Sequence, residues 1–203
     1  MATKTSKPSV KATKDRKPAA ASTRAVAKTA SVAKAPAKTI RSAKPRSVPI
    51  RLGVEAVGIV HNAVLDLTGT DRAWGDVESR IELSPAFEAE ALDGIERFSH
   101  VEVVFVFHKV PDSEIETGTR HPRDDPRYPK VGIFAQRNKA RPNRIGLTIC
   151  SVVRRDGRTL VVKGLDALDG SPVLDVKPVM QEYLPQGDVR QPGWSHEVLE
   201  DYW

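Results

Sequence analysis

Short apolar runs separated by turn-forming residues make up most of the chain from about residue 48 onward. The strongest is Val101–His108 (VEVVFVFH), whose nearly continuous apolar character predicts a strand buried on both faces. Asp156-Gly157, which lies between two apolar runs, is typical of a hairpin turn. The same pattern predicts further strands at Val54–Asn62, Glu78–Leu83, Val131–Ala135, Ile145–Arg154, Thr159–Leu165 and Val173–Val176.

Few segments have a helical pattern. Ser84-Pro85 introduces a short predicted helix at Ala86–Leu92, and a second is expected at Ser195–Tyr202. Pro111–Pro129 contains four prolines and mixed charge, which predicts a long loop of the kind that is usually functional or mobile. Many short strands and few helices predict a mainly β fold, a small barrel or sandwich with a few short helices.

Composition divides the chain into a tail, residues 1–47, and a body, residues 48–203. The tail has nine Lys and four Arg against one acid, a net charge of +12, whereas the body has 19 basic and 25 acidic residues, a net charge of −6. The tail lacks aromatic residues and is rich in Ala, Lys, Ser, Thr and Pro, so we expect disorder. It is a solubilising extension, a non-specific nucleic-acid anchor or an organelle transit peptide, although its excess of Lys over Arg disfavours the last.

Several classes of protein are disfavoured. The single cysteine, Cys150, rules out a disulfide framework and fits a reducing compartment, and its place in the apolar run LTICSVV predicts a buried thiol. No apolar run approaches the ~18 residues of a membrane span. The chain has no phosphate-binding loop and no dinucleotide-binding glycine motif. None of its histidines falls at metal-ligand spacing, so no metal site is expected.

A cationic loop lies between the apolar runs that end at Ala135 and begin at Ile145. Arginine side chains are forked donors that suit carboxylates, phosphates and base edges. The loop is therefore either an anion-binding surface or an ordinary basic hairpin loop. Its members are Arg137, Lys139, Arg141 and Arg144, with Pro142-Asn143 fixing the centre and Gly146 allowing close approach of a ligand.

A second cluster lies at residues 164–178 (GLDALDGSPVLDVKP). Three acids, Asp166, Asp169 and Asp175, surround a turn at Asp169-Gly170. Carboxylates and carbonyl groups at such a turn suit a cationic or amino-bearing ligand, while the simpler reading is a tight turn with solvated acids.

These segments together resemble the TsaA-like tRNA methyltransferases. FAQRNKARPNRIGLT is similar to the family's F-A-T-R-S-x-x-R-P-N-P-I-G-L-S motif, and GLDALDGSPVLDVKP to its L-D-x-x-D-G-T-P-V-x-D-I-K-P motif. LDGIERFSHVEVVFVFHKV and VEAVGIVHN resemble two earlier segments of the family, in the same order. The resemblance covers roughly residues 52–180.

The resemblance implies a single-sheet β-barrel that binds S-adenosylmethionine, works as a cytoplasmic homodimer, and methylates N6 of threonylcarbamoyladenosine at position 37 of tRNA. It implies cofactor contacts at His108, Lys109, Arg137, Leu147, Asp169, Gly170, Ser171 and Pro172, with a further strip at Trp74, Gly75 and Asp76. His108 is also the candidate catalytic group. Arg141, Asn143 and Arg144 are the candidate tRNA-binding residues.

The chain departs from the family pattern in its cationic loop. Arg144 replaces a proline, Gln136 stands where Thr is usual, and Asn138 where Ser is usual. Two other functions therefore stay open. One is a methyltransferase that uses the same cofactor on another RNA or a small molecule, and the other is a non-catalytic nucleic-acid-binding protein.

Overall fold

The computed structural model describes residues 52–66 and 73–203. The chain divides into two units, residues 1–49 and 50–203, and only the second contains described residues. The predicted basic tail, residues 1–47, lies outside the described residues, so its expected disorder stays a prediction.

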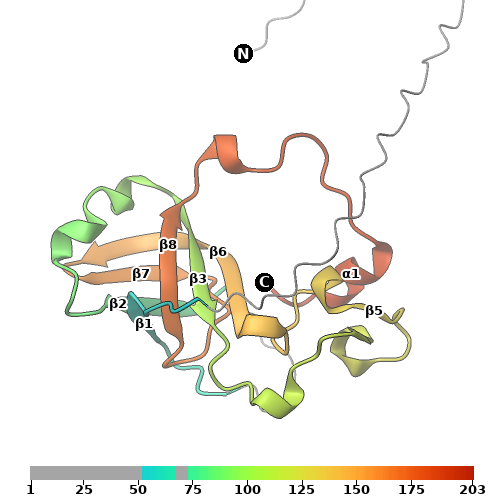
Figure 1. Cartoon of the computed structure of the whole chain (residues 1–203). Helices are drawn as coiled ribbons and strands as arrows, with labels where there is room; N and C mark the ends of the chain where they lie inside the picture. The colour runs from blue at the N-terminus through green and yellow to red at the C-terminus, as the bar shows by residue number, and fades with distance from the viewer. Residues whose placement is uncertain (1–51, 67–72) are drawn as a thin grey trace, which may run out of the picture. The chain divides into compact units, whose positions relative to one another are not determined.

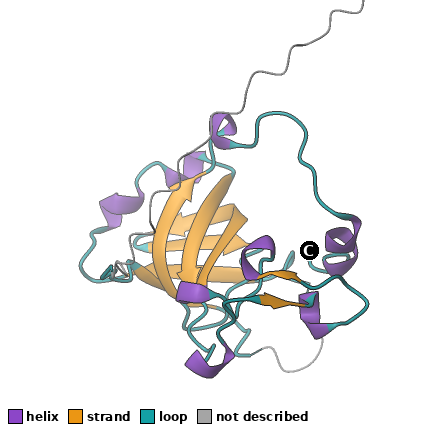
Figure 2. Cartoon of the chain, turned by 45° about the vertical axis from the view of Figure 1, so that its right-hand side comes forward, coloured by secondary structure: helices purple, strands orange, loops and turns teal. Residues whose placement is uncertain are grey.

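The second unit is built around a closed antiparallel barrel of six strands (Figures 1 and 2). Closure pairs every strand on both sides, which removes the exposed sheet edges that otherwise invite aggregation. The predicted mainly β barrel is thus confirmed. In order around the barrel the strands are β1 (Gly58–His61), β2 (Glu78–Leu83), β7 (Thr159–Lys163), β6 (Ile145–Asp156), β3 (His100–Val106) and β8 (Pro172–Pro178).

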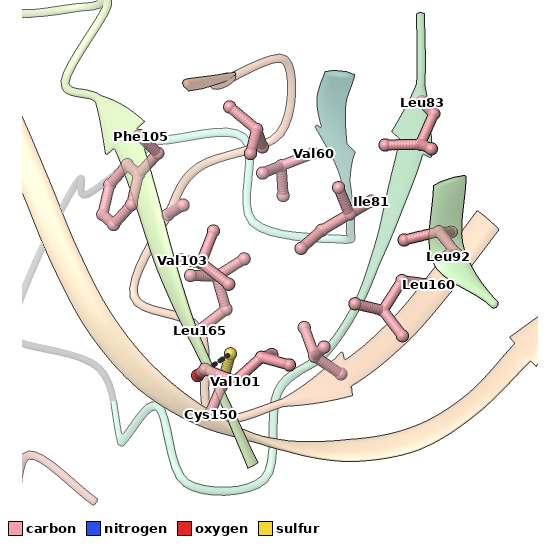
Figure 3. Close-up of a cluster of buried hydrophobic side chains, with 13 residues drawn as sticks. Val60, Ile81, Leu83, Leu92, Val101, Val103, Phe105, Cys150, Leu160 and Leu165 are labelled. Carbon is pink, nitrogen blue, oxygen red and sulfur yellow. Dashed lines mark hydrogen bonds between the residues drawn. The ribbon is translucent and has the colours of Figure 1, made fainter. Parts of the chain in front are cut away.

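Alternating side chains fill the barrel (Figure 3). In β3 the inward residues Val101, Val103 and Phe105 are fully buried, and β2 alternates exposed and buried positions along its length. Phe105 lies against the backbone of Gly146, its partner across β3 and β6, where any side chain would meet the ring. The other face of β3, which includes Val104 and Val106, is only half-buried, so the prediction of a strand buried on both faces is wrong. Continuous apolar character does not separate the inward residues of a strand from the outward ones.

Cys150 confirms the predicted buried thiol. It is 2% exposed and its Sγ donates a weak hydrogen bond of 3.7 Å to the carbonyl oxygen of Val101, drawn as a dashed line in Figure 3. Burial, with a smaller effect from the charge of Asp166, raises its pKa to about 12. This thiol is unreactive at neutral pH.

One end of the barrel, which we call the rim, gathers all the segments that carry candidate site residues. Because neighbouring strands run in opposite directions, β1, β3 and β7 end at the rim while β2, β6 and β8 begin there. The segments before β2, after β3, before β6 and between β7 and β8 therefore meet at the same end. The fold explains why motifs far apart in sequence can form one site.

Several predicted elements differ from the observed ones. The strand predicted at Val54–Asn62 is observed only as β1, Gly58–His61. Of the strand predicted at Val131–Ala135, only the first two residues form a strand, β5 (Val131–Gly132), which pairs with β4 (Thr119–Arg120). The prediction is wrong for residues 133–135. Residues 133–135 turn instead, burying Ile133 and exposing Phe134. The predicted long loop contains three-residue 3₁₀ turns and β4. Within the described residues the 3₁₀ turns are η1 (Ala89–Leu92), η2 (Ile95–Arg97), η3 (Asp112–Glu114), η4 (Pro122–Asp124), η5 (Ile133–Ala135), η6 (Pro142–Arg144) and η7 (Gln181–Tyr183).

The two predicted helices are shorter than expected. Ala86–Leu92 forms only the 3₁₀ turn η1, which ends when Asp93 and the left-handed Gly94 redirect the chain. Ser195–Tyr202 is replaced by α1 (Gly193–Val198), which ends before the chain extends toward the rim. In residues 52–66 and 73–203, no helix combines the length and the apolar character needed to cross a bilayer.

A test of barrel closure is the substitution Gly58→Ala. A Cβ at Gly58 would lie 2.5 Å from the carbonyl oxygen of Glu82 on β2, and backbone cannot move aside as a flexible side chain can. We expect the free energy of unfolding to fall by about 1–3 kcal/mol. Gly132→Ala is the control, because nothing lies within 4 Å of its Cβ position. Urea unfolding that gives equal stabilities for the two variants would contradict this packing.

Candidate functional site

His108 and the turn between β7 and β8 meet at the rim. Nδ1 of His108 lies 3.2 Å from Oγ of Ser171, which is only 2% exposed. Gly170 adopts a φ of +76°, and a Cβ there would lie 3.7 Å from Nε2 of His108. Glycine is therefore favoured by the backbone conformation, and a Cβ there would be in ordinary contact with the imidazole. The structure thus brings together three residues that the motifs predict, although His108 follows β3 and the other two lie between β7 and β8.

The turn is fixed on one side by the segment that follows β1. The backbone N–H groups of Asp169 and Gly170 each donate a 2.8 Å hydrogen bond, to the carbonyl oxygens of Val64 and Val60. Asn62 donates from its backbone N–H to Oδ1 of Asp169 (3.1 Å) and from its side chain to the carbonyl oxygen of Ala167 (2.9 Å). Pro172 follows as the first residue of β8, where it pairs with Ile59. Backbone and side-chain hydrogen bonds thus fix the turn against the segment that follows β1.

Asn62 is a positioning residue that the motifs did not identify. Its amide also donates to Oγ of the buried Ser79 (2.9 Å), and its Oδ1 accepts the backbone N–H of Val64 (2.9 Å). One side chain thereby connects β1, β2 and the 166–172 turn. In the sequence it is only a polar residue at the end of a predicted strand, which is too weak a signal to single it out.

The charge state of His108 follows from its neighbours. Partial desolvation and then the positive charge of Lys109 lower the pKa of His108 below its ordinary 6.5. A hydrogen bond that the imidazole donates to the backbone carbonyl group of Val106 and the negative charge of Asp169 act in the opposite direction. Lys109 itself donates to the carbonyl oxygen of Leu65. A lowered pKa leaves the imidazole neutral at pH 7, with one nitrogen able to accept a proton.

Arg137 and Leu147 form a second contact at the rim. The Arg137 guanidinium donates to the carbonyl oxygen of Leu147, which lies in the third position of β6. Arg137 and Leu147 are both exposed. This contact ties the cationic loop to the barrel and places the guanidinium at the start of β6.

The other arginines of the cationic loop bind parts of the chain. Arg141 donates to the carbonyl oxygen of Gln136 (3.2 Å), and Arg144 forms an ion pair with Asp112 of η3. Asn143 and Arg144 both have positive φ, +65° and +53°, in the turn η6. Asn143 is exposed and Arg144 half-buried. The candidate tRNA-binding residues are thus close in space, with the two arginines already engaged.

Two departures from the family pattern, Gln136 and Arg144, have structural explanations. Gln136 is buried, and its amide donates to the carbonyl oxygens of Arg120 and Val131, both at 3.0 Å. It therefore bonds to both strands of the β4–β5 pair. Arg144, which stands where the family motif has proline, has an acid partner in Asp112.

The strip Trp74–Asp76 contacts the C-terminal residues. Trp74 is 3% exposed and its backbone N–H donates to the carbonyl oxygen of Tyr202 (2.8 Å). A Cβ at Gly75 would lie 2.8 Å from the carbonyl carbon of Trp203. Asp76 pairs with Lys163 at 2.8 Å, and this hydrogen bond and charge lower the pKa of Asp76. The contacts of this strip are thus with Tyr202, Trp203 and Lys163.

Asp166 connects the barrel interior to the C-terminal residues. Its carboxylate accepts hydrogen bonds from the hydroxyl groups of Thr148, on β6, and Tyr202. The sequence places Asp166 in an acidic turn but gives no sign of either partner. Over the residues that the structure describes, no three His, Cys, Asp or Glu side chains are grouped to hold a metal ion.

Comparisons with known proteins follow the same motifs. A family model described as the tRNA-methyltransferase O N-terminal domain matches residues 70–185. A probable S-adenosyl-L-methionine-binding protein of Pyrococcus abyssi is 33% identical over 147 residues, 71% of this chain and 74% of that protein. The human tRNA (adenine(37)-N6)-methyltransferase is 36% identical over 121 residues, which are 60% of this chain and 26% of the human protein.

Solved structures agree with the fold. The crystal structure of TrmO from Pseudomonas aeruginosa is 29% identical, with a TM-score of 0.55 over 70% of this chain and 62% of that one. The chain therefore spans about a quarter of the human enzyme and about three fifths of the Pseudomonas structure.

The lowered pKa of His108 can be tested by NMR titration of its ring. We expect the midpoint to lie below 6.5, to rise in Lys109→Gln, which removes a repelling charge, and to fall in Asp169→Asn, which removes an attracting one. The unfolded chain then binds more protons below pH 6.5, so His108 reduces stability as pH falls through this range. A midpoint at or above 6.5 in the wild type would contradict this account.

Proposed function

Because the chain belongs to the tRNA-methyltransferase O N-terminal domain family, as the motifs predict, we propose that it is an S-adenosylmethionine-dependent methyltransferase that modifies N6 of threonylcarbamoyladenosine at position 37 of tRNA. The observation that carries the proposal is the meeting of His108, Gly170 and Ser171 at one rim of the barrel. All three lie within the matched residues 70–185. The names of the archaeal and human relatives agree with the cofactor and the reaction.

The chemistry of the rim fits the cofactor. S-adenosylmethionine carries a sulfonium, an amino group and a carboxylate, so it needs acceptors and a cation at the same site. Asp169 and the carbonyl groups of the turn suit the positive groups, while the guanidinium of Arg137 suits the carboxylate. A Cβ at position 170 would narrow the space beside His108. We assign cofactor binding to these residues together with Lys109, Leu147, Ser171 and Pro172.

The chain's part in methyl transfer is to orient the reactants and to move a proton. When bound, the cofactor supplies the methyl group, and transfer requires the attacking nitrogen, methyl carbon and sulfur in line. The N6 nitrogen carries an acyl group and loses a proton, so a nearby acceptor helps. His108 is neutral at pH 7, and with Nδ1 facing Ser171 its Nε2 is the nitrogen for this role.

Binding of the RNA anions falls to the cationic loop. The substrate carries a carboxylate on its threonyl arm and phosphates on either side, and Arg141, Asn143 and Arg144 lie together at η6. Asp112, the partner of Arg144, has a side chain that is 96% exposed. We propose that a phosphate replaces this exposed carboxylate as the partner of Arg144.

The outer face of β6 supports a homodimer. Ile145, Leu147 and Ile149 point outward and are 42%, 42% and 46% exposed. Val104 and Val106 of β3 lie opposite Leu147 and Ile145, which extends the apolar surface across two strands. A second copy of the chain that covered this face would bury these side chains beside the rim.

We also propose a cytoplasmic location for the protein. Its single, buried cysteine is consistent with this location.

The reaction is tested by methyl transfer to tRNA with and without the threonylcarbamoyl group. We expect transfer only to the modified tRNA, detected by mass spectrometry of nucleosides. Transfer to other RNA or to small molecules alone would show a different substrate for the same cofactor site.

Cofactor binding is tested separately by calorimetry with S-adenosylhomocysteine. Arg137→Ala should raise its Kd by roughly 10- to 100-fold, because a charge-assisted hydrogen bond is lost. Lys139→Ala, the removal of another exposed cation in the same loop, should leave it unchanged. No heat with the wild-type chain would favour a non-catalytic nucleic-acid-binding protein.

The basic tail, residues 1–47, has a proposed part in RNA binding. Its net charge of +12 contrasts with −6 for the rest of the chain, so it would attract RNA that the body repels. Deleting it should weaken tRNA binding mainly at low salt and leave the Kd for S-adenosylhomocysteine unchanged. Equal tRNA affinity at low salt with and without the tail would remove this proposal.

A further inference from the structure

The C-terminal residues return to the rim after leaving the barrel. β8 ends at Pro178, and the chain then passes through η7 and α1, drawn in red in Figure 1, before reaching Tyr202. There the carbonyl oxygen of Tyr202 accepts the N–H of Trp74 and its hydroxyl group donates to Asp166. One hydrogen bond of the backbone and one of the side chain therefore fix the position of Tyr202.

These contacts hold Trp203 in place while leaving it exposed. Its backbone lies so close to Gly75 that a Cβ there would be 2.8 Å away, and its ring lies 3.9 Å from the Cβ position of Gly164. Its ring packs edge-on against Tyr202, with 5.0 Å between centroids and an interplanar angle of 89°. Yet Trp203 is 60% exposed. An anchored aromatic ring with so much exposed surface is suited to contact a ligand.

The position of Trp203 relates it to the proposed reaction. Gly75 precedes β2 and Gly164 follows β7, so both lie at the rim. Asp166, which anchors Tyr202, begins the same turn that carries Asp169 and Gly170. By contrast Tyr183, which is 85% exposed, follows the end of β8 away from the rim.

An unpaired base must be held beside the cofactor for its exocyclic nitrogen to react. Proteins hold unstacked RNA bases chiefly on aromatic side chains, and a ring that is already fixed loses little entropy when the base arrives. We propose that Trp203 is the surface on which the target base of the substrate RNA stacks, with Tyr202 and Gly75 positioning it. This inference rests on the proposed function, since it assumes an RNA substrate at the rim.

The test measures RNA binding by fluorescence anisotropy in saturating S-adenosylhomocysteine. The first RNA is an anticodon stem-loop with threonylcarbamoyladenosine at position 37. The second RNA is the same stem-loop with the sugar and phosphate of position 37 but no base there. Trp203→Ala should raise the Kd for the first RNA by roughly 5- to 100-fold and leave that for the second unchanged. Trp203→Phe, which keeps an aromatic face, should recover most of the loss. Tyr183→Ala is the matched control, with no expected change.

The outcomes separate this inference from the proposed function. The Kd for S-adenosylhomocysteine should be the same in the wild type and in Trp203→Ala, because the ring is assigned to the base. An unchanged Kd of Trp203→Ala for the modified RNA would overturn the stacking role. So would an equal rise in the Kd for both RNAs, or an equal rise in the Kd for S-adenosylhomocysteine. A wild-type chain that binds S-adenosylhomocysteine but neither RNA would overturn it too. A wild-type chain that binds none of the three would overturn the proposed function and the inference with it.

Discussion

The pairing between β1 and β8 closes the barrel and also shapes the site. Only two residue pairs form this ladder, Gly58 with Val173 and Ile59 with Pro172. The next backbone hydrogen bonds along the same line run from Val60 to Ser171, from Gly170 to Val60 and from Asp169 to Val64. The turn that faces His108 is therefore a continuation of the ladder that completes the barrel. A change that opened this short ladder would therefore disturb the turn and the fold together.

Positive and negative groups at the rim are arranged around a neutral imidazole. Lys109 and Asp169 act in opposite directions on the pKa of His108. Desolvation is the largest effect and lowers this pKa, which favours the neutral form. A protonated His108 would repel a sulfonium and could not accept a proton. Partial burial of this residue, more than any single charge beside it, therefore suits the proposed chemistry.

The parts of the fold that the sequence predicts are those in which the pattern itself supplies the driving force. Strands such as β2 and β3 have alternating or continuous apolar residues, so burial alone defines them. The predicted strand Val131–Ala135 is wrong beyond Gly132, because its partner β4 is only two residues long and the chain turns at Ile133. The composition of five residues cannot show how long the partner strand is.

The same limit applies to the candidate site. Family motifs led to His108 and Ser171, which lie 63 residues apart, whereas spacing alone gave no reason for them to meet. The role of Asn62 was not predicted, nor were the contacts of Asp166 with Thr148 and Tyr202. Asn62 and Asp166 are single polar residues in the sequence, and only the closed barrel brings their partners close to them. Sequence patterns thus identify the residues of this site better than the hydrogen bonds that hold them.

The cationic loop illustrates how a basic sequence can be less available than its charge suggests. Arg144 pairs with Asp112, and Arg141 with a backbone carbonyl group, so neither is a bare cation facing solvent. The proposed binding of a phosphate at Arg144 would then exchange one anion for another. Such an exchange gains less free energy than pairing an isolated charge, but it keeps the guanidinium oriented before the RNA arrives. In an acidic body, arginines that already have partners suit the discrimination of one RNA from another at η6 more than the general attraction of RNA. Long-range attraction of RNA then depends on other parts of the chain.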